Sequence, residues 1–264
     1  MAAKVTRSRA LIGTDDSDAS SYSSSPYFSP IRFHGTALTG LVTDTAMVMT
    51  GDGMSHTEVQ YDLAQDAYTV VRLDEFYQPV IKVCKINSSM FFCASGNEDD
   101  CKTLRIWLLR WFAKWGWEKK TFRQYADLLQ DGIKKLEGSD EEKPQALLGG
   151  FDKNEDPCVP LLYMVSTEYV FAVHASRERF VCIGCGHDIS GAFLTPRFDA
   201  STCSVDQVVW LGQGSVARAG DDGSADGIIT TVAVTAAGIV HHSGIDIKDV
   251  RKLHGFRPVR RPLL

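Results

Sequence analysis

Short apolar runs broken by polar residues open the folded part of the chain and predict β-structure. Two such runs, residues 36–42 and 46–50, are separated by a polar tripeptide, which predicts an antiparallel hairpin. Residues 54–78 are polar and aromatic without a firm period, so we expect a long excursion on the surface. A second pair of strands is expected after this excursion, at 80–86 and 90–94.

The period of the apolar positions then changes to that of an α-helix. Large apolar residues recur at spacings of three and four between residues 104 and 115. This pattern predicts a core-facing helix that begins at Asn97, a typical capping residue, and ends at Gly116. A second helix of the same kind is expected over residues 121–136.

The second half of the chain predicts more strands, two further helices and a closing pair of strands. The expected strands lie at 145–150, 161–166, 169–175, 179–183, 228–234 and 239–247, and the expected helices at 184–194 and 204–219. Strands and helices occur in groups instead of alternating βαβ units, and this grouping favours antiparallel sheets with helices outside. We therefore predict an α+β fold, a four-layer αββα sandwich of two antiparallel sheets.

The two ends of the chain differ from this pattern. Residues 15–25 are polar and dense in serine, with too little apolar surface to offset the entropy of ordering. We predict that residues 1–35 form a flexible leader, that 36–250 form one domain, and that 251–264 form a basic C-terminal tail.

Composition and charge exclude several classes of function. The 264 residues are 44% hydrophobic and 23% charged, which is typical of globular proteins. Twenty-eight basic and 33 acidic residues give a net charge of −5, so we expect no nucleic-acid partner. No run of eighteen apolar residues occurs, so we expect no membrane span. The seven scattered cysteines favour free thiols over a disulfide framework.

Three residues form the most informative candidate site. Thr36 stands at the head of the first expected strand, Asp52 at the end of the second, and Lys82 on the third. A threonine that becomes an N-terminus by cleavage after Gly35 carries its own base, because a free α-amine has a pKa of about 8. A nearby lysine favours the deprotonated hydroxyl, and an aspartate keeps that lysine charged and oriented. On residue types alone, a turn threonine and a surface ion pair are the simpler interpretation.

A zinc site is a weaker candidate. Cys182 and Cys185 are separated by two residues, and His174 and His187 lie nearby in the sequence. A structural zinc site takes four ligands, however, and a second cysteine pair is absent. We therefore favour buried thiols at the end of a strand, and predict no metal and no cofactor.

Several segments occur in an order and with spacings that are specific together, although each alone is loose. They are FSPIRFHGTALTGLV, AMVMTGD, IKVCKINSSMFFCASG followed by DCKTL, ALLGGFD, CIGCG, and DDGSADGIITTVAVTAAGI. Through these segments the chain resembles, over residues 28–249, the β-type subunits of the eukaryotic proteasome core particle in the N-terminal nucleophile hydrolase superfamily. The resemblance is closest to the structural sixth β subunit, and it implies the N-terminal nucleophile hydrolase fold.

The resemblance implies roles for five residues if the site is active. Thr36 falls on the nucleophile position, at the family spacing from the motif aspartate Asp52, and Lys82 matches the motif lysine. The backbone N–H of Gly96 would donate to the oxyanion, and Asp222 matches a further motif aspartate. The structural sixth subunit usually has glycine in place of Thr36, so this residue is a departure toward activity.

Other departures point the opposite way. Met54 stands where active members have arginine, Cys185 stands where they have a serine in a GSG-like turn, and Ala225 stands at a second serine position. A shift of one residue would instead place Ser224 there, with Asp221 as its aspartate. Cysteine is a weak hydrogen-bond partner and alanine is none, so we expect a disturbed network around the amine of the nucleophile.

The resemblance leads to two functional hypotheses. The first is a β-ring subunit in ubiquitin-dependent protein degradation, with a structural and assembly role and no peptidase activity of its own. The alternative is a threonine endopeptidase that uses Thr36 after cleavage at Gly35. In both cases the expected partners are other β subunits in a seven-membered ring, α-ring subunits, the opposite β ring and unfolded polypeptides. The resemblance also implies localisation to the cytoplasm and nucleus.

Overall fold

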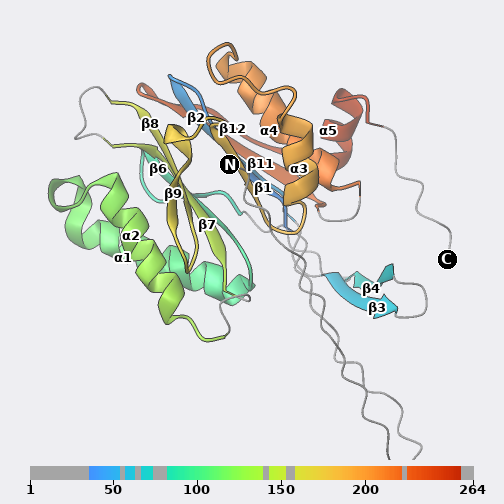
Figure 1. The fold of residues 1–264 in the computed structure, drawn as a ribbon, viewed down its shortest axis with the longest axis horizontal. Helices are drawn as coiled ribbons and strands as arrows, with labels where there is room; N and C mark the ends of the chain where they lie inside the picture. Colours follow the sequence, from blue (N-terminus) through green and yellow to red (C-terminus); the bar gives the residue numbers. More distant parts are fainter. Residues whose placement is uncertain are drawn as a thin grey trace, which may run out of the picture.

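Two five-stranded antiparallel sheets form the centre of the computed structural model (Figure 1). The structure describes residues 36–53, 57–62, 67–73, 82–138, 143–152, 158–221 and 225–256. The predicted leader and the end of the predicted tail lie outside these ranges.

The first sheet carries the N-terminal hairpin at its centre. Its strand order is β10-β1-β2-β11-β12, and each pair of neighbours is antiparallel. The strands are β1 (Leu38–Val42), β2 (Ala46–Gly51), β10 (Phe180–Ile183), β11 (Ile228–Thr235) and β12 (Gly238–Asp246). The predicted hairpin of β1 and β2 is therefore confirmed, with its turn at the polar tripeptide.

The second sheet is built from strands that follow one another along the chain. Its order is β5-β6-β7-β8-β9, again antiparallel throughout. The strands are β5 (Cys84–Lys85), β6 (Met90–Ser95), β7 (Gln145–Phe151), β8 (Pro160–Val165) and β9 (Val170–Ala172). The carboxamide oxygen of Asn87 accepts hydrogen bonds from the N–H groups of Ser89 and Met90, at 2.7 and 2.9 Å, and so fixes the turn before β6.

An apolar layer joins the facing sides of the two sheets. Leu38, Met47 and Met49 of the first sheet share a buried cluster with Cys93 and other residues of the second sheet. The sheets approach closely, since a Cβ added at Gly149 would lie 2.7 Å from Met49 Cε. Burial of this layer on both sides stabilises the face-to-face packing of the two sheets.

Helices cover the outer face of each sheet (Figure 1). A buried cluster joins α1 (Glu98–Lys119) and α2 (Phe122–Lys135) to the second sheet. Two further clusters join the first sheet to α3 (His187–Leu194), α4 (Val205–Ala219) and α5 (Ile247–Leu253). The structure is thus a mixed α/β arrangement of two antiparallel sheets with helices outside, which agrees with the predicted two-sheet sandwich.

Local capping signals set the helix boundaries. Thr121 and Ser204 each form a capping box with a glutamine three residues later, at the starts of α2 and α4. Asn97 accepts a hydrogen bond from Asp99 N at 2.9 Å at the start of α1, as expected from the sequence. The expected end at Gly116 is a break within α1, where φ is 55° and ψ is −167°, and one more turn follows to Lys119.

The structure adds elements to two predicted segments and corrects the end of one predicted strand. The surface excursion contains an antiparallel hairpin, β3 (Thr57–Asp62) with β4 (Ala67–Leu73), because both segments are rich in β-branched and aromatic residues. The end of the strand predicted at 169–175 is a 3₁₀ turn, Val173–Ala175. The predicted basic tail is helical at its start, since α5 includes residues 251–253.

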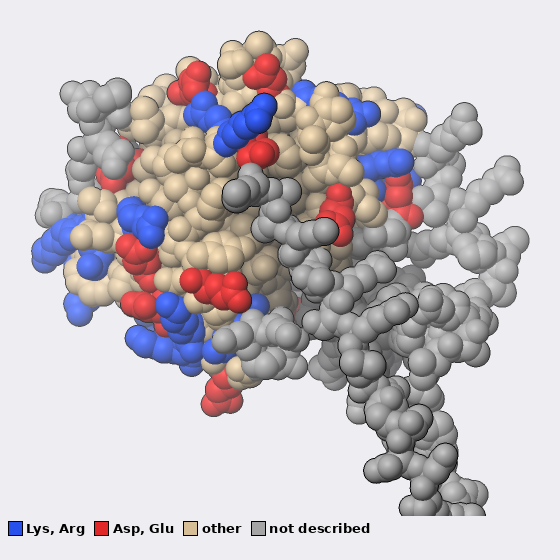
Figure 2. All heavy atoms as spheres, viewed as in Figure 1, with Lys and Arg blue, Asp and Glu red and all other residues tan. Residues whose placement is uncertain are grey.

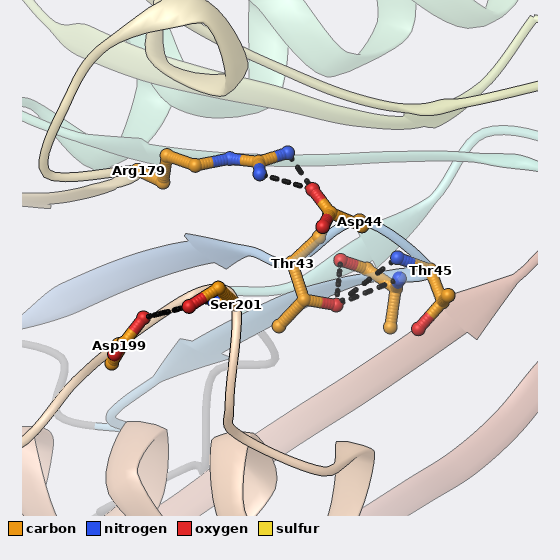
Figure 3. Close-up of polar contacts among 7 residues, drawn as sticks. Thr43, Asp44, Thr45, Arg179, Asp199 and Ser201 are labelled. Carbon is orange, nitrogen blue, oxygen red and sulfur yellow. Dashed lines mark hydrogen bonds and ion pairs between the residues drawn. The ribbon is translucent and has the colours of Figure 1, made fainter.

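The far end of the β1–β2 hairpin is closed by polar contacts (Figure 3). Thr43 Oγ1 accepts hydrogen bonds from the N–H groups of Thr45 and Ala46, at 3.3 and 3.0 Å. The guanidinium of Arg179, which precedes β10, forms an ion pair with Asp44 and donates to Thr43 O at 3.2 Å. These contacts fix the register of β1 and thereby the position of its other end, where Thr36 lies.

The surface carries both signs of charge. On the face seen in Figure 2, lysine and arginine side chains are interspersed with aspartate and glutamate, and neither sign forms a continuous field.

None of the described helices combines the length and the hydropathy that a bilayer crossing needs.

An aromatic cluster attaches the C-terminal end of α5 to α4 and predicts a pH-dependent stability. The ring of His254 stacks on Trp210 with centroids 3.9 Å apart, and burial lowers the pKa of His254 to about 4. The unfolded chain therefore binds this proton more readily, and stability is expected to fall as the pH drops from 6.5 to 4. We expect a loss of about 1–2 kcal/mol, reduced by solvent screening because the residue is half-buried. Urea unfolding at pH 7 and at pH 4.5 measures this loss as a change in the free energy of unfolding. The variant His254→Phe should lose less stability between these two pH values than the wild type. A loss of the same size in both proteins would contradict the prediction.

Candidate active site

Thr36 lies two residues before β1, and its hydroxyl contacts the half-buried ammonium group of Lys82. The Lys82 Nζ donates to Thr36 Oγ1 at 3.0 Å and forms an ion pair with Asp52 Oδ1 at 3.0 Å. Thr36 is 3% exposed and Asp52 is 1% exposed, so both residues are shielded from solvent. The structure thus brings together three residues that are far apart in the sequence, around one ammonium group.

Asp52 also fixes the head of β1. It follows the last residue of β2, and its Oδ1 accepts a hydrogen bond from Ala37 N at 3.0 Å. Its own backbone N–H donates to Ala37 O at 3.2 Å. The residue after Thr36 is therefore held from two sides, which limits the movement of the Thr36 side chain.

Lys82 reaches this site from outside the sheet ladder. The sequence placed it on a strand, but β5 contains only Cys84 and Lys85. Lys82 precedes this strand, and its side chain extends to Asp52, which directly follows β2 of the other sheet. Because a Cβ added at Gly51 would lie 3.5 Å from Lys82 Cβ, the lysine stem packs on the end of β2.

Buried thiols near Lys82 are not competing nucleophiles. Burial raises the pKa of Cys101 to about 12, and it raises the pKa of Cys93 further, although the charge of Lys82 acts in the opposite direction on both. Both thiols are therefore protonated at neutral pH, and the thiol form is the weaker nucleophile.

A glycine-cysteine-glycine turn packs on the backbone of Thr36. Thr36 N donates to Cys185 Sγ at 3.2 Å, and the Cys185 thiol donates to Thr36 O at 3.5 Å. At Gly184, where φ is +91°, an added Cβ would lie 2.2 Å from Thr36 O, so only glycine allows this approach. Cys185 was weighed as a zinc ligand and, through the resemblance, expected near the amine of the nucleophile; its contact with Thr36 O was not expected.

The structure says less about the other predicted site residues, Gly96 and Asp222. Gly96 follows Ser95, whose Oγ lies 3.0 Å from a Cβ built at Gly184, so the end of β6 borders the same turn. The oxyanion role of Gly96 stays a prediction. Asp222 lies outside the described residues, as does Ser224, and Ala225 is buried at 3% exposure.

The cysteines weighed as zinc ligands have separate environments. Cys182 Sγ accepts a hydrogen bond from Thr39 Oγ1 at 3.8 Å, and burial raises the pKa of Cys182 to about 12. Cys185 instead contacts Thr36. Among the residues that the structure describes, no group of three or more histidine, cysteine, aspartate or glutamate side chains has the arrangement of a metal site.

The arrangement around Thr36 is suited to nucleophilic chemistry. A hydroxyl that accepts a hydrogen bond from an ammonium group is more readily deprotonated, and the adjacent carboxylate orients the ammonium group. A scan against protein-family models matched no family, and a search among curated proteins found no match. The geometry of Thr36, Asp52 and Lys82 is therefore the basis on which a function is assigned to this chain.

Proposed function

We propose that this chain is a β-type subunit of a proteasome core particle, with the N-terminal nucleophile hydrolase fold and a threonine peptidase site at Thr36. The proposal is supported by the sequence motifs, by two antiparallel sheets with helices outside, and by the place of Thr36 at the head of a central strand. The proposed partners are other β subunits, α-ring subunits, the opposite β ring and unfolded polypeptides, in the cytoplasm and nucleus.

One observation carries the proposed activity: the Lys82 ammonium donates to both Thr36 Oγ1 and Asp52 Oδ1, each at 3.0 Å. After cleavage of the Gly35–Thr36 bond, the freed α-amine of Thr36 takes the proton from Oγ1 as this oxygen attacks a substrate carbonyl. The ammonium stabilises the negative charge that develops on Oγ1, and the Gly96 N–H is the proposed donor to the oxyanion. The amine returns the proton to the leaving nitrogen, and water then hydrolyses the Thr36 ester.

The N-terminus of the mature chain tests this proposal. Intact-mass analysis of the protein purified in its natural assembly is expected to show a chain that starts at Thr36. A threonine-directed epoxyketone is then expected to add once, at Thr36, because the reagent needs both the hydroxyl and the free amine. A mature chain that starts before Thr36 would contradict the peptidase proposal, since no free amine would then serve as the base.

A structural subunit without its own activity is the second candidate. It is favoured by the thiol of Cys185 at the Thr36 nitrogen, where active members of the resembled family have a serine hydroxyl, and by Ala225 at a second serine position. A thiol is the weaker hydrogen-bond partner, so proton transfer at the amine would be impaired. A chain that starts at Thr36 but does not react with the epoxyketone would favour this candidate.

A further inference from the structure

The side of α1 that faces away from the second sheet carries both apolar and basic residues. Exposed residues recur on it at spacings of three and four, which is the period of one helix face. Two of them are aliphatic, Ile106 at 47% exposure and Leu109 at 37%. Three cationic residues surround this pair, and we call the five together the basic face of α1: Arg105, Ile106, Leu109, Arg110 and Lys114.

The cations of the basic face have no acidic neighbour on the described part of the chain. None of the ion pairs among the described residues includes one of the three. Lys102, which lies closer to the start of α1, instead pairs with Glu98 at 2.7 Å. Lys114 lies over the ring of Trp115, 5.2 Å from its centroid. Exposed cations around a pair of exposed aliphatic side chains fit a segment that is both acidic and apolar.

The chain itself contains a segment of this kind, in the leader outside the described residues. Residues 11–18 read LIGTDDSD, an apolar pair followed by three aspartates, and no lysine or arginine occurs between Arg9 and Arg32. We propose that residues 11–18 bind to the basic face of α1 in the uncleaved chain, with the apolar pair against the two aliphatic side chains and the aspartates beside the three cations. The inference holds for either candidate function, because it needs neither hydrolysis nor a free α-amine.

The leader is long enough to reach this face. Thr36 and the end of β6 border the same turn, since Thr36 O and Ser95 Oγ lie 2.2 and 3.0 Å from a Cβ built at Gly184. From Ser95 the chain enters α1 within three residues and then rises about 1.5 Å per residue, so Lys114 lies no more than roughly 45 Å from Thr36. Residues 18–36 span up to about 60 Å when they are extended.

The covalent connection makes weak contacts sufficient. An exposed ion pair contributes little by itself, but a tethered segment acts at an effective concentration on the order of millimolar. Cleavage after Gly35, which belongs to the proposed function, removes this tether. The same contacts must then form between two molecules, so the basic face becomes free for another partner.

Zero-length crosslinking with a carbodiimide tests the inference in the full chain. The reagent joins a carboxylate to an amine only where the two are in contact, and Lys114 supplies the amine of the basic face. In the Thr36→Ala chain, which lacks the hydroxyl that the proposed cleavage needs, peptide mapping is expected to find Lys114 joined to Asp15, Asp16 or Asp18. The yield should fall at least about threefold from about 0.05 M to about 0.5 M NaCl, because salt screens exposed charges.

Charge reversal on the basic face tests the proposed contact directly. Arg105→Glu/Arg110→Glu in the Thr36→Ala chain keeps the reacting amine of Lys114 and should lower the yield at least about fivefold, since two carboxylates then repel the aspartates. The matched control Lys248→Glu/Lys252→Glu changes the net charge by the same amount at two exposed positions of α5 and should leave the yield unchanged. An equal yield in both double variants would overturn the inference.

Two further measurements exclude other occupants of the basic face. Leu11→Ser/Ile12→Ser keeps every charge and should lower the yield about threefold, because the apolar part of the contact is lost. In a mixture of ¹⁵N-labelled and unlabelled chains, each crosslinked pair should carry a single isotope. Pairs of mixed isotope would show a contact between two copies, and Lys114 joined only to the acidic residues 140–142 would show a different occupant; either result, or no link at all, would overturn the inference.

The intact mass of the wild-type chain separates this inference from the proposed function. A wild-type chain that keeps its leader and shows the same link would contradict the peptidase proposal and support the contact with α1. A wild-type chain that starts at Thr36, together with a Thr36→Ala chain that shows no link, would support the peptidase proposal and overturn the contact.

Discussion

A Thr36→Ala chain is expected to remain uncleaved after Gly35 and to hydrolyse peptides at least about 10³-fold more slowly than wild type. Thr36 Oγ1 is the atom that accepts the Lys82 hydrogen bond, and alanine has no atom at this position. The ammonium and the carboxylate of Asp52 remain, but they then have no hydroxyl to activate. Intact mass reports the processing, and kcat/KM for fluorogenic peptides reports the activity.

Two variants control for effects on folding. Thr36→Ser keeps the hydroxyl and should be processed, with activity within about 10²-fold of wild type. Thr39→Ala removes a buried hydroxyl from the same strand, where it contacts Ser215 Oγ at 2.9 Å, and should leave processing and hydrolysis intact. If a particle that contains Thr36→Ala keeps every peptidase activity, the structural candidate is correct and the peptidase proposal is wrong.

The fold could be predicted from the sequence where its signals are local. The hairpin at the N-terminus and the helices α2 and α4 follow from apolar periodicity and from capping residues, and the structure has them within one or two residues of the expected bounds. The partner of β10 could not be predicted, since this strand follows β9 in the sequence but pairs with β1 of the other sheet. Such long-range pairing depends on tertiary packing and leaves no signal in a short window.

The helix α5 shows a second kind of limit. The strand was expected to continue through Ile247, whereas β12 ends at Asp246. Asp246 instead accepts a hydrogen bond from Lys248 N at 2.8 Å and begins a helix of seven residues, too short to show a clear helical period.

For the candidate site, the expectation came from the resemblance. The proximity of Thr36, Asp52 and Lys82 was expected from a resemblance in motif and spacing, and the structure places them within hydrogen-bond distance. The contact of Cys185 with the Thr36 nitrogen was also implied by the resemblance, which puts this turn position beside the amine of the nucleophile, whereas the residue types alone suggested only a weak zinc site. The catalytic roles of these residues stay predictions.

Replacement of Lys82 by methionine is expected to lower the stability of the fold as well as the activity. Methionine keeps most of the volume of the lysine side chain, which is only 10% exposed, but it has no charge. The buried carboxylate of Asp52 is then left without its ammonium partner. Loss of one partner of a buried ion pair typically costs about 3–5 kcal/mol, and we expect a loss of this size at pH 7. Hydrolysis should fall by about 10²–10⁴-fold, since the charge that stabilises the Thr36 oxygen is gone.

The pH dependence of stability and a second substitution test whether the unpaired Asp52 carboxylate causes the stability loss of Lys82→Met. Protonation of the Asp52 carboxylate relieves the buried charge, so the stability loss of Lys82→Met should be smaller at pH 5 than at pH 7 in urea unfolding. The double variant Lys82→Met/Asp52→Asn should regain part of the lost stability, because an asparagine oxygen still accepts the Ala37 N–H, and yet remain inactive. Lys102→Met removes a surface ion pair with Glu98 on α1 and should change neither property. The prediction would be contradicted if Lys82→Met lost less than about 1 kcal/mol of unfolding free energy and still hydrolysed the peptides. The ammonium would then support neither the fold nor the nucleophile.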